Sequence, residues 1–67
     1  MSVAKVIEIT AESPKSADEA IRVGVKRASK TVENIQSVWV KEIKASVENG
    51  DVKAYRVDLK ITFLLSD

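Results

Sequence analysis

Side chains that could carry out catalysis are scarce in this sequence. Its 67 residues include no histidine and no cysteine, which excludes thiol nucleophiles, disulfides and Cys/His zinc sites. The hydroxyls of Ser37, Ser46 and Thr62 therefore have no histidine to activate them as nucleophiles. We expect a binding or structural protein and not an enzyme.

Carboxylates are the candidate ligands for a metal ion. Calcium takes about six to eight oxygen ligands, and no segment here has the spacing of an EF-hand loop. A calcium site shared between subunits remains an alternative. If there is no such site, Asp58 is expected to form an ion pair with Lys41. The sequence therefore identifies no complete metal site within one chain. The carboxylates that could contribute to a shared site are Glu42, Glu48, Asp51 and Asp58.

The charge balance argues against two large classes of partner. Eleven basic and ten acidic side chains give a formal net charge of +1, so there is no broad attraction to nucleic acid or to an anionic membrane. No apolar run reaches the roughly 18 residues of a membrane span, and no signal peptide precedes the first strand pattern. We expect a soluble cytoplasmic protein that binds neither nucleic acid nor membranes.

A short strand and an amphipathic helix are predicted in the first half of the chain. Residues 4–10 are rich in valine and isoleucine, which is typical of a strand. The helix is predicted to begin at Ser16, in a capping box with Glu19, or alternatively at Ser13-Pro14, and to end at Asn34. Val23 lies off the apolar face and is a candidate contact with another subunit. The apolar face itself consists of Ala17, Ala20, Ile21, Gly24, Val25, Ala28 and Val32.

A long hairpin is predicted in the second half. Residues 37–47 and 52–65 alternate with a period of two, and Asn49-Gly50 between them favours a type I′ turn. A two-residue loop fixes which residues pair across the hairpin. The expected pairs are Val40–Leu59 and Val38–Ile61 on the helix-covered face, with Lys41–Asp58, Trp39–Lys60, Ile43–Arg56 and Ser37–Thr62 on the other face.

The length of the last strand predicts self-association. A 12-residue alternating stretch spans about 40 Å at about 3.3 Å per residue, which the helix is too short to cover at about 1.5 Å per residue. Apolar strand ends and an open sheet edge would be left in water, and closed symmetric association hides both. The predicted fold is α+β, a single domain over residues 1–67. It is a βαββ chain whose three-stranded antiparallel sheet, in the order 1-3-2, wraps around one helix.

The order of elements and several local sequences resemble the dodecin family. The resemblance covers essentially the whole chain and implies a hollow homododecamer with helices outside and sheets facing inward. Many members bind pairs of flavins, riboflavin or FMN, between symmetry-related tryptophans, and sequester them without catalysis. The matching segments are Lys5-Val6-Ile7-Glu8-Ile9, Ser13-Pro14, Ala20-Ile21, Arg27-Ala28, Thr31-Val32 and Ile61-Thr62-Phe63-Leu64-Leu65.

The chain departs from the family pattern at the flavin site. The flavin-stacking tryptophan of the family aligns with Ser37, the flavin-contacting glutamine with Arg56, and a late arginine with Leu64. Serine cannot stack on a flavin, and a guanidinium can only donate hydrogen bonds. The resemblance therefore implies a flavin-lacking branch, one member of which is described as a calcium dodecin.

Trp39 leaves two interpretations open. It lies two residues after Ser37 on the same face, where it could stack a flavin or another small planar ligand, with Lys60 or Arg56 near the ligand's anionic tail. Alternatively it fills a contact between subunits, where aromatic residues are enriched. The candidate ligand-binding residues are Ser37, Trp39, Arg56 and Lys60; the remaining alternative is a structural shell that binds only metal ions.

Overall fold

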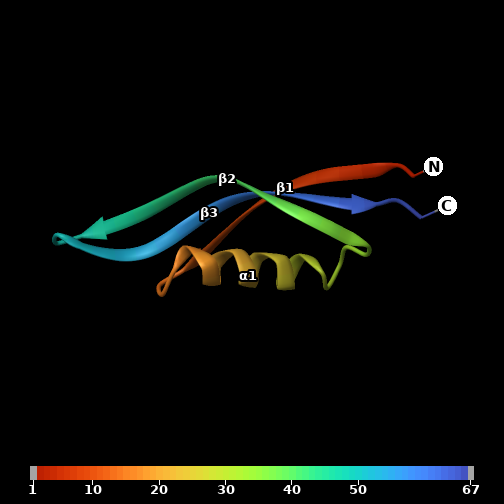
Figure 1. Ribbon diagram of the computed structural model, residues 1–67. Helices are drawn as coiled ribbons and strands as arrows, with labels where there is room; N and C mark the ends of the chain where they lie inside the picture. The colour runs from red at the N-terminus through yellow and green to blue at the C-terminus, as the bar shows by residue number, and fades with distance from the viewer. Residues whose placement is uncertain (1, 67) are drawn as a thin grey trace.

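One helix packs on one face of a three-stranded antiparallel sheet in the computed structural model, which describes residues 2–66 (Figure 1). The order of the strands across the sheet is β1-β3-β2. Both the βαββ order and this strand order confirm the prediction; Met1 and Asp67, the ends of the predicted domain, lie outside the described residues. The elements are β1 (Ala4–Ser13), α1 (Ala17–Ala28), β2 (Ile35–Glu48) and β3 (Asp51–Leu64).

The helix begins where its capping residue predicts. Ser16 has an extended backbone, and its hydroxyl accepts a hydrogen bond from the Glu19 amide at 3.0 Å. The alternative start at Ser13-Pro14 is wrong, because β1 continues to Ser13. The Glu19 carboxylate, expected to reach back to Ser16, instead accepts a hydrogen bond from the buried Ser13 hydroxyl. This bond ties the end of β1 to the first turn of the helix.

The helix ends earlier than its apolar pattern suggests. Its last residue is Ala28, and not a residue next to Asn34. The amides of Thr31 and Val32 both donate to the Ala28 carbonyl, at 3.1 and 2.9 Å, which closes the last turn. Both residues are β-branched and so favour helix less. Asn34, with a φ of 62°, is a left-handed residue that turns the chain into β2.

The core lies between α1 and the middle of β3. Val57, Leu59 and Ile61 of β3 are completely buried, as is Ala20 of the helix. A Cβ placed on Gly24 would lie 3.0 Å from the Cβ of Ala11 in β1. The missing side chain thus lets the helix approach the sheet closely. No helix within residues 2–66 is both long enough and apolar enough to cross a membrane.

The hairpin turn has the predicted form, because Asn49 and Gly50 have φ angles of 53° and 82°. Val40 pairs with Leu59 and Trp39 with Lys60, as predicted. Two further predicted pairs, Val38–Ile61 and Ser37–Thr62, are also confirmed.

The middle of the hairpin departs from the predicted register. Lys53 in β3 and Lys41 in β2 have no partner in the pairing of these strands, so the register shifts by one residue between them. The predicted pairs Lys41–Asp58 and Ile43–Arg56 are therefore wrong. Asp58 faces Glu42, and Ile43 faces Val57 on the helix-covered side. Lys41 forms its ion pair with Glu8 of β1 instead, at 3.6 Å.

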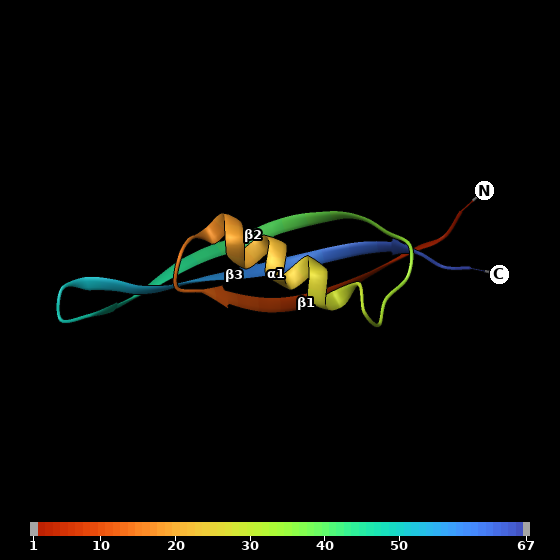
Figure 2. The same ribbon diagram turned by 90° about the horizontal axis from the view of Figure 1, so that it is seen from below.

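The end of the β2–β3 hairpin projects beyond the helix (Figure 2). We call residues 43–55 the arm. The molecule is 51 Å long, and the 12-residue helix covers only part of that length. Ile43, Val47 and Val52 of the arm are 56, 64 and 50% exposed. The prediction that the helix leaves part of the long hairpin uncovered is confirmed.

A candidate ligand-binding face

The face of the sheet opposite α1, which we call the open face, carries all four predicted ligand-binding residues. Residues that pair directly across antiparallel strands point to the same face, so the face can be read as rows from β1 through β3 to β2. The rows are Val6–Thr62–Ser37, Glu8–Lys60–Trp39, Thr10–Asp58–Glu42 and Glu12–Arg56–Lys44.

Trp39 and Lys60 lie together in one row. The ammonium nitrogen of Lys60 is 5.3 Å from the centre of the Trp39 ring, which is a cation–π contact. Trp39 is nevertheless 61% exposed. One chain thus places a cation over an aromatic residue that is largely exposed.

Ser37 lies in the neighbouring row, opposite Thr62. It is two residues from Trp39 along β2, which is about 6–7 Å on a strand. Its side chain is exposed and offers one hydroxyl group. The Ser37 row thus presents no aromatic surface.

Arg56 is directed toward β1, away from the tryptophan. Its Nε and Nη2 atoms lie 2.9 and 2.7 Å from the same carboxylate oxygen of Glu12. Along β3 it is four residues from Lys60, which corresponds to about 13 Å. Within one chain, the structure therefore groups Arg56 with Glu12 and Lys44, and not with Trp39.

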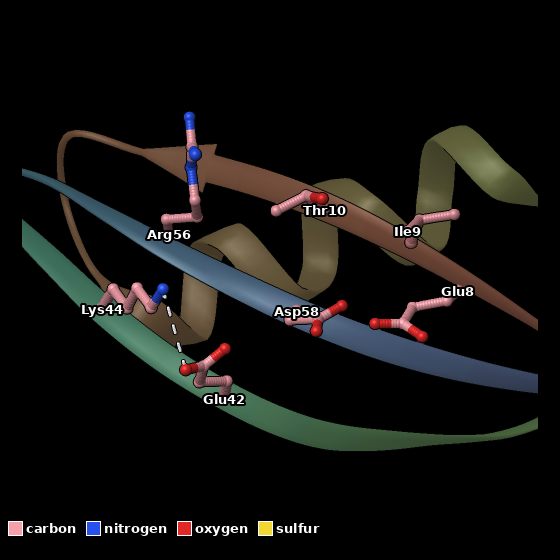
Figure 3. Close-up of a pocket in the computed structure, with 7 residues that line it drawn as sticks. All are labelled: Glu8, Ile9, Thr10, Glu42, Lys44, Arg56 and Asp58. Atoms are coloured by element: carbon pink, nitrogen blue, oxygen red, sulfur yellow. Dashed lines mark ion pairs between the residues drawn. The ribbon is translucent and has the colours of Figure 1, made fainter.

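A polar depression of about 240 Å³ lies on the open face, and Arg56 and Lys44 are among the residues that line it (Figure 3). Glu42 faces Asp58 within it, and the Lys44 ammonium lies 3.7 Å from the Glu42 carboxylate. Glu8 and Thr10 line it from β1. Sequence reasoning missed these two residues, because the long connection through the helix does not fix the β1–β3 register as a tight turn does.

The four candidate metal ligands separate into two pairs. Glu42 and Asp58 lie on the open face, whereas Glu48 and Asp51 flank the hairpin turn. Glu48 also forms an ion pair with Lys53 at 3.0 Å. Across residues 2–66 no group of three or more carboxylates is placed to hold a metal ion.

Comparison with known proteins gives one consistent family. The family model described as Dodecin matches residues 3–66. The dodecin of Thermus thermophilus is 32% identical over 65 residues, which are 97% of this chain and 94% of that protein. The calcium dodecin of Mycobacterium tuberculosis is 36% identical over 63 residues, which are 94% of this chain and 89% of that protein.

Solved structures agree with the fold. Dodecin from Streptomyces davaonensis superposes with a TM-score of 0.94 at 32% identity, over 98% of this chain and 97% of that one. A crystal structure of the Mycobacterium tuberculosis calcium dodecin gives a TM-score of 0.83 at 35% identity, over 97% and 93% of the two chains. Sequence identity is thus slightly higher to the calcium dodecin, whereas the backbone follows the Streptomyces protein more closely.

Proposed function

Since this chain belongs to the dodecin family, we propose that it is a non-enzymatic subunit of a hollow homododecamer that binds or sequesters a small ligand, with the usual flavin site weakened or lost. The observation that carries this proposal is Ser37. On the open face, at the position that aligns with the flavin-stacking tryptophan of the family, the chain presents only a hydroxyl.

The loss of stacking is the larger effect. An aromatic contact contributes about 0.5–1.5 kcal/mol beyond its buried area, and burial of apolar surface adds about 25 cal/mol per Å². Ser37 and its cross-strand partner Thr62 supply neither contribution. A flavin seated over this row would therefore lose the surface that binds it in the family.

The hydrogen bonding of Arg56 supports the same proposal. A flavin ring edge carries both donors and acceptors, and a glutamine amide can serve both, whereas a guanidinium only donates. Two N–H groups of Arg56 are already directed at Glu12. A ligand would have to compete with that carboxylate for them.

Trp39 supports a second candidate function, that of a flavin-binding storage dodecin with a displaced stacking platform. Its ring is exposed on the same face, one row from Ser37, and Lys60 stands beside it as a partner for an anionic group. A third candidate, a structural shell that binds only ions, draws on Glu42 facing Asp58 and on the calcium dodecin relative. All three candidate functions assume the same homododecamer, and they differ only in the ligand that it binds.

One titration separates the three candidates. Ligand-free protein, with its oligomer mass fixed by native mass spectrometry, is titrated with riboflavin, FMN and Ca²⁺, alongside a Trp39→Ala variant. Under the first proposal we expect no quenching of flavin fluorescence at submicromolar concentrations. Submicromolar quenching that disappears in Trp39→Ala, with the mass unchanged, would establish the displaced platform instead. Calcium binding without flavin binding would favour the ion shell.

A further inference from the structure

The tip of the arm, which lies beyond the end of the helix (Figure 2), brings two groups together that can react with each other. Asn49 and Gly50 form the turn, and both residues are exposed. Strand pairing ends at Glu48 and Asp51, so the Gly50 amide takes no part in it. Outside residues 49–51, no described atom lies within 4 Å of the place that a Cβ would occupy on Gly50. The side-chain amide of Asn49 and the main-chain nitrogen of Gly50 are therefore both accessible.

Asn34 offers a comparison within the same chain, because it also has a left-handed backbone. Its main-chain carbonyl accepts hydrogen bonds from the Leu64 amide at 3.0 Å and from the Gln36 side chain at 3.2 Å. The next residue is Ile35, whose branched side chain crowds its own main-chain nitrogen. Among the side-chain hydrogen bonds of residues 2–66, none involves Asn49. Asn34 is thus held in place and followed by a bulky residue, whereas Asn49 is neither.

We propose that Asn49 is a site of spontaneous covalent modification, at which the asparagine is converted through a succinimide into aspartate and isoaspartate. The reaction needs no enzyme and no co-reactant besides water. A following glycine favours it, because a residue without a side chain leaves its main-chain nitrogen open to close approach. The arm would thereby change its charge and its backbone as the protein ages.

The reaction has two steps. The Gly50 amide loses its proton to a base in the solvent, and its nitrogen attacks Cγ of Asn49. A bond forms between that nitrogen and Cγ, the bond from Cγ to Nδ2 breaks, and ammonia leaves with a proton taken from the solvent. Water then opens the five-membered ring. Attack of water at Cγ gives aspartate, and attack at the main-chain carbonyl carbon of residue 49 gives isoaspartate.

Both products add a negative charge to a tip that is already acidic. An aspartate or isoaspartate carboxyl group is ionised at neutral pH. The new carboxylate lies between Glu48 and Asp51 in the sequence, and the ammonium of Lys53 is already paired with Glu48 at 3.0 Å. The modified turn therefore carries three successive acidic groups around one glycine.

The two products differ in their effect on the hairpin. Asp-Gly suits a type I′ turn as Asn-Gly does, so aspartate changes only the charge. Isoaspartate carries the main chain through its own side chain and so adds one atom to the loop. Because the loop fixes the register of the strands, the pairing of Val47 with Val52 next to the turn should then loosen.

Peptide mapping of the stored assembly tests the reaction. Full-length protein is kept in warm neutral buffer, and samples are digested with trypsin, which releases Asn49 in residues 45–53 and Asn34 in residues 31–41. We expect the peptide of residues 45–53 to lose its unmodified form and to yield two acidic isomers. One of them should be a substrate for an isoaspartyl methyltransferase. The peptide of residues 31–41 is the internal control and should stay unmodified over the same time.

Hydrogen exchange of the arm tests the structural effect. Stored protein should exchange the amides around Val47 and Val52 faster than fresh protein. Freshly prepared Asn49→Asp, which adds the charge without the extra backbone atom, should match fresh protein. The proposal is overturned if Asn49 persists as long as Asn34, if aspartate forms without isoaspartate, or if conversion leaves the exchange of the arm unchanged. The test does not depend on which ligand the open face binds.

Discussion

Ser37 and Trp39 show that a shift of two residues along a strand changes the neighbours of an aromatic ring. Both side chains lie on the open face, yet the shift moves the aromatic ring from the row of Thr62 to the row of Lys60. A cation already lies over the ring in its present position. A planar ligand must displace that cation or use the remaining ring surface, so Trp39 does not simply replace an aromatic residue at position 37.

Returning an aromatic residue to position 37 should therefore strengthen flavin binding. We expect Ser37→Trp, combined with Arg56→Gln, to bind riboflavin more tightly by about two- to tenfold for each new ring that stacks on the flavin. The measurement is quenching of riboflavin fluorescence. Ser46→Trp is the matched control, because it adds the same ring to the same strand beside Ala54, in the arm. Equal quenching by the two variants would show that the position of the ring does not matter.

The hairpin sequence was sufficient to predict which residues share the row of Trp39 and the row of Ser37. It was not sufficient for Arg56, whose partner Glu12 lies on β1. Residues 14–34 separate β1 from β2 with a helix and its connections, and no tight turn fixes how β1 aligns with β3. The depression lined by Glu8 and Thr10 was missed for the same reason.

At the scale of elements, the hairpin shows how a correct turn can yield a partly wrong register. The pairs next to the turn follow the sequence prediction, and so do those from Val40 to Ser37. Lys53 adds one residue to β3 and Lys41 then adds one to β2, so the second irregularity reverses the shift made by the first. Alternation of apolar residues does not reveal where such bulges occur, because each bulge changes the alternation only locally.

The close packing of α1 on the sheet depends on Gly24. A Cβ there would meet the Cβ of Ala11 at 3.0 Å and the Cδ1 of Leu59 at 3.1 Å. The leucine methyl can rotate away, whereas the Ala11 Cβ moves only with its strand. The apolar helix pattern predicted a face made of small residues, but the sequence alone could not show which of them approaches β1 most closely.

Gly24→Ala should destabilise the protein despite the better helix propensity of alanine. The propensity favours alanine by about 1 kcal/mol, while overpacking costs about 1–3 kcal/mol, so we expect a net loss of about 1 kcal/mol. Urea unfolding at one fixed protein concentration measures it. Lys26→Ala, at an exposed position of the same helix, should stay within about 0.5 kcal/mol of the parent. A higher midpoint for Gly24→Ala would mean that the helix moves away from β1 at little cost.

At the scale of the whole molecule, the core of one chain is small. The largest side chains that are fully buried are Leu59, Ile61 and Val57, all on one strand. A chain of 67 residues without disulfides usually needs association or a metal to be stable. The sequence predicted association from the length of the last strand, but the number of copies depends on interface angles that one chain does not define.

Stability should consequently depend on the protein concentration. If the folded form is the assembly, the thermal midpoint rises with concentration by mass action.

Val47→Asp should weaken association by roughly 10- to 100-fold, because a buried valine contributes about 1.5–3 kcal/mol. Gel filtration across a dilution series measures the shift. Ser46→Asp adds the same charge to the opposite face of the arm and should change association much less. A folded monomer whose thermal midpoint is independent of concentration would show that the chain needs no second copy, and that the exposed apolar side of the arm has another role.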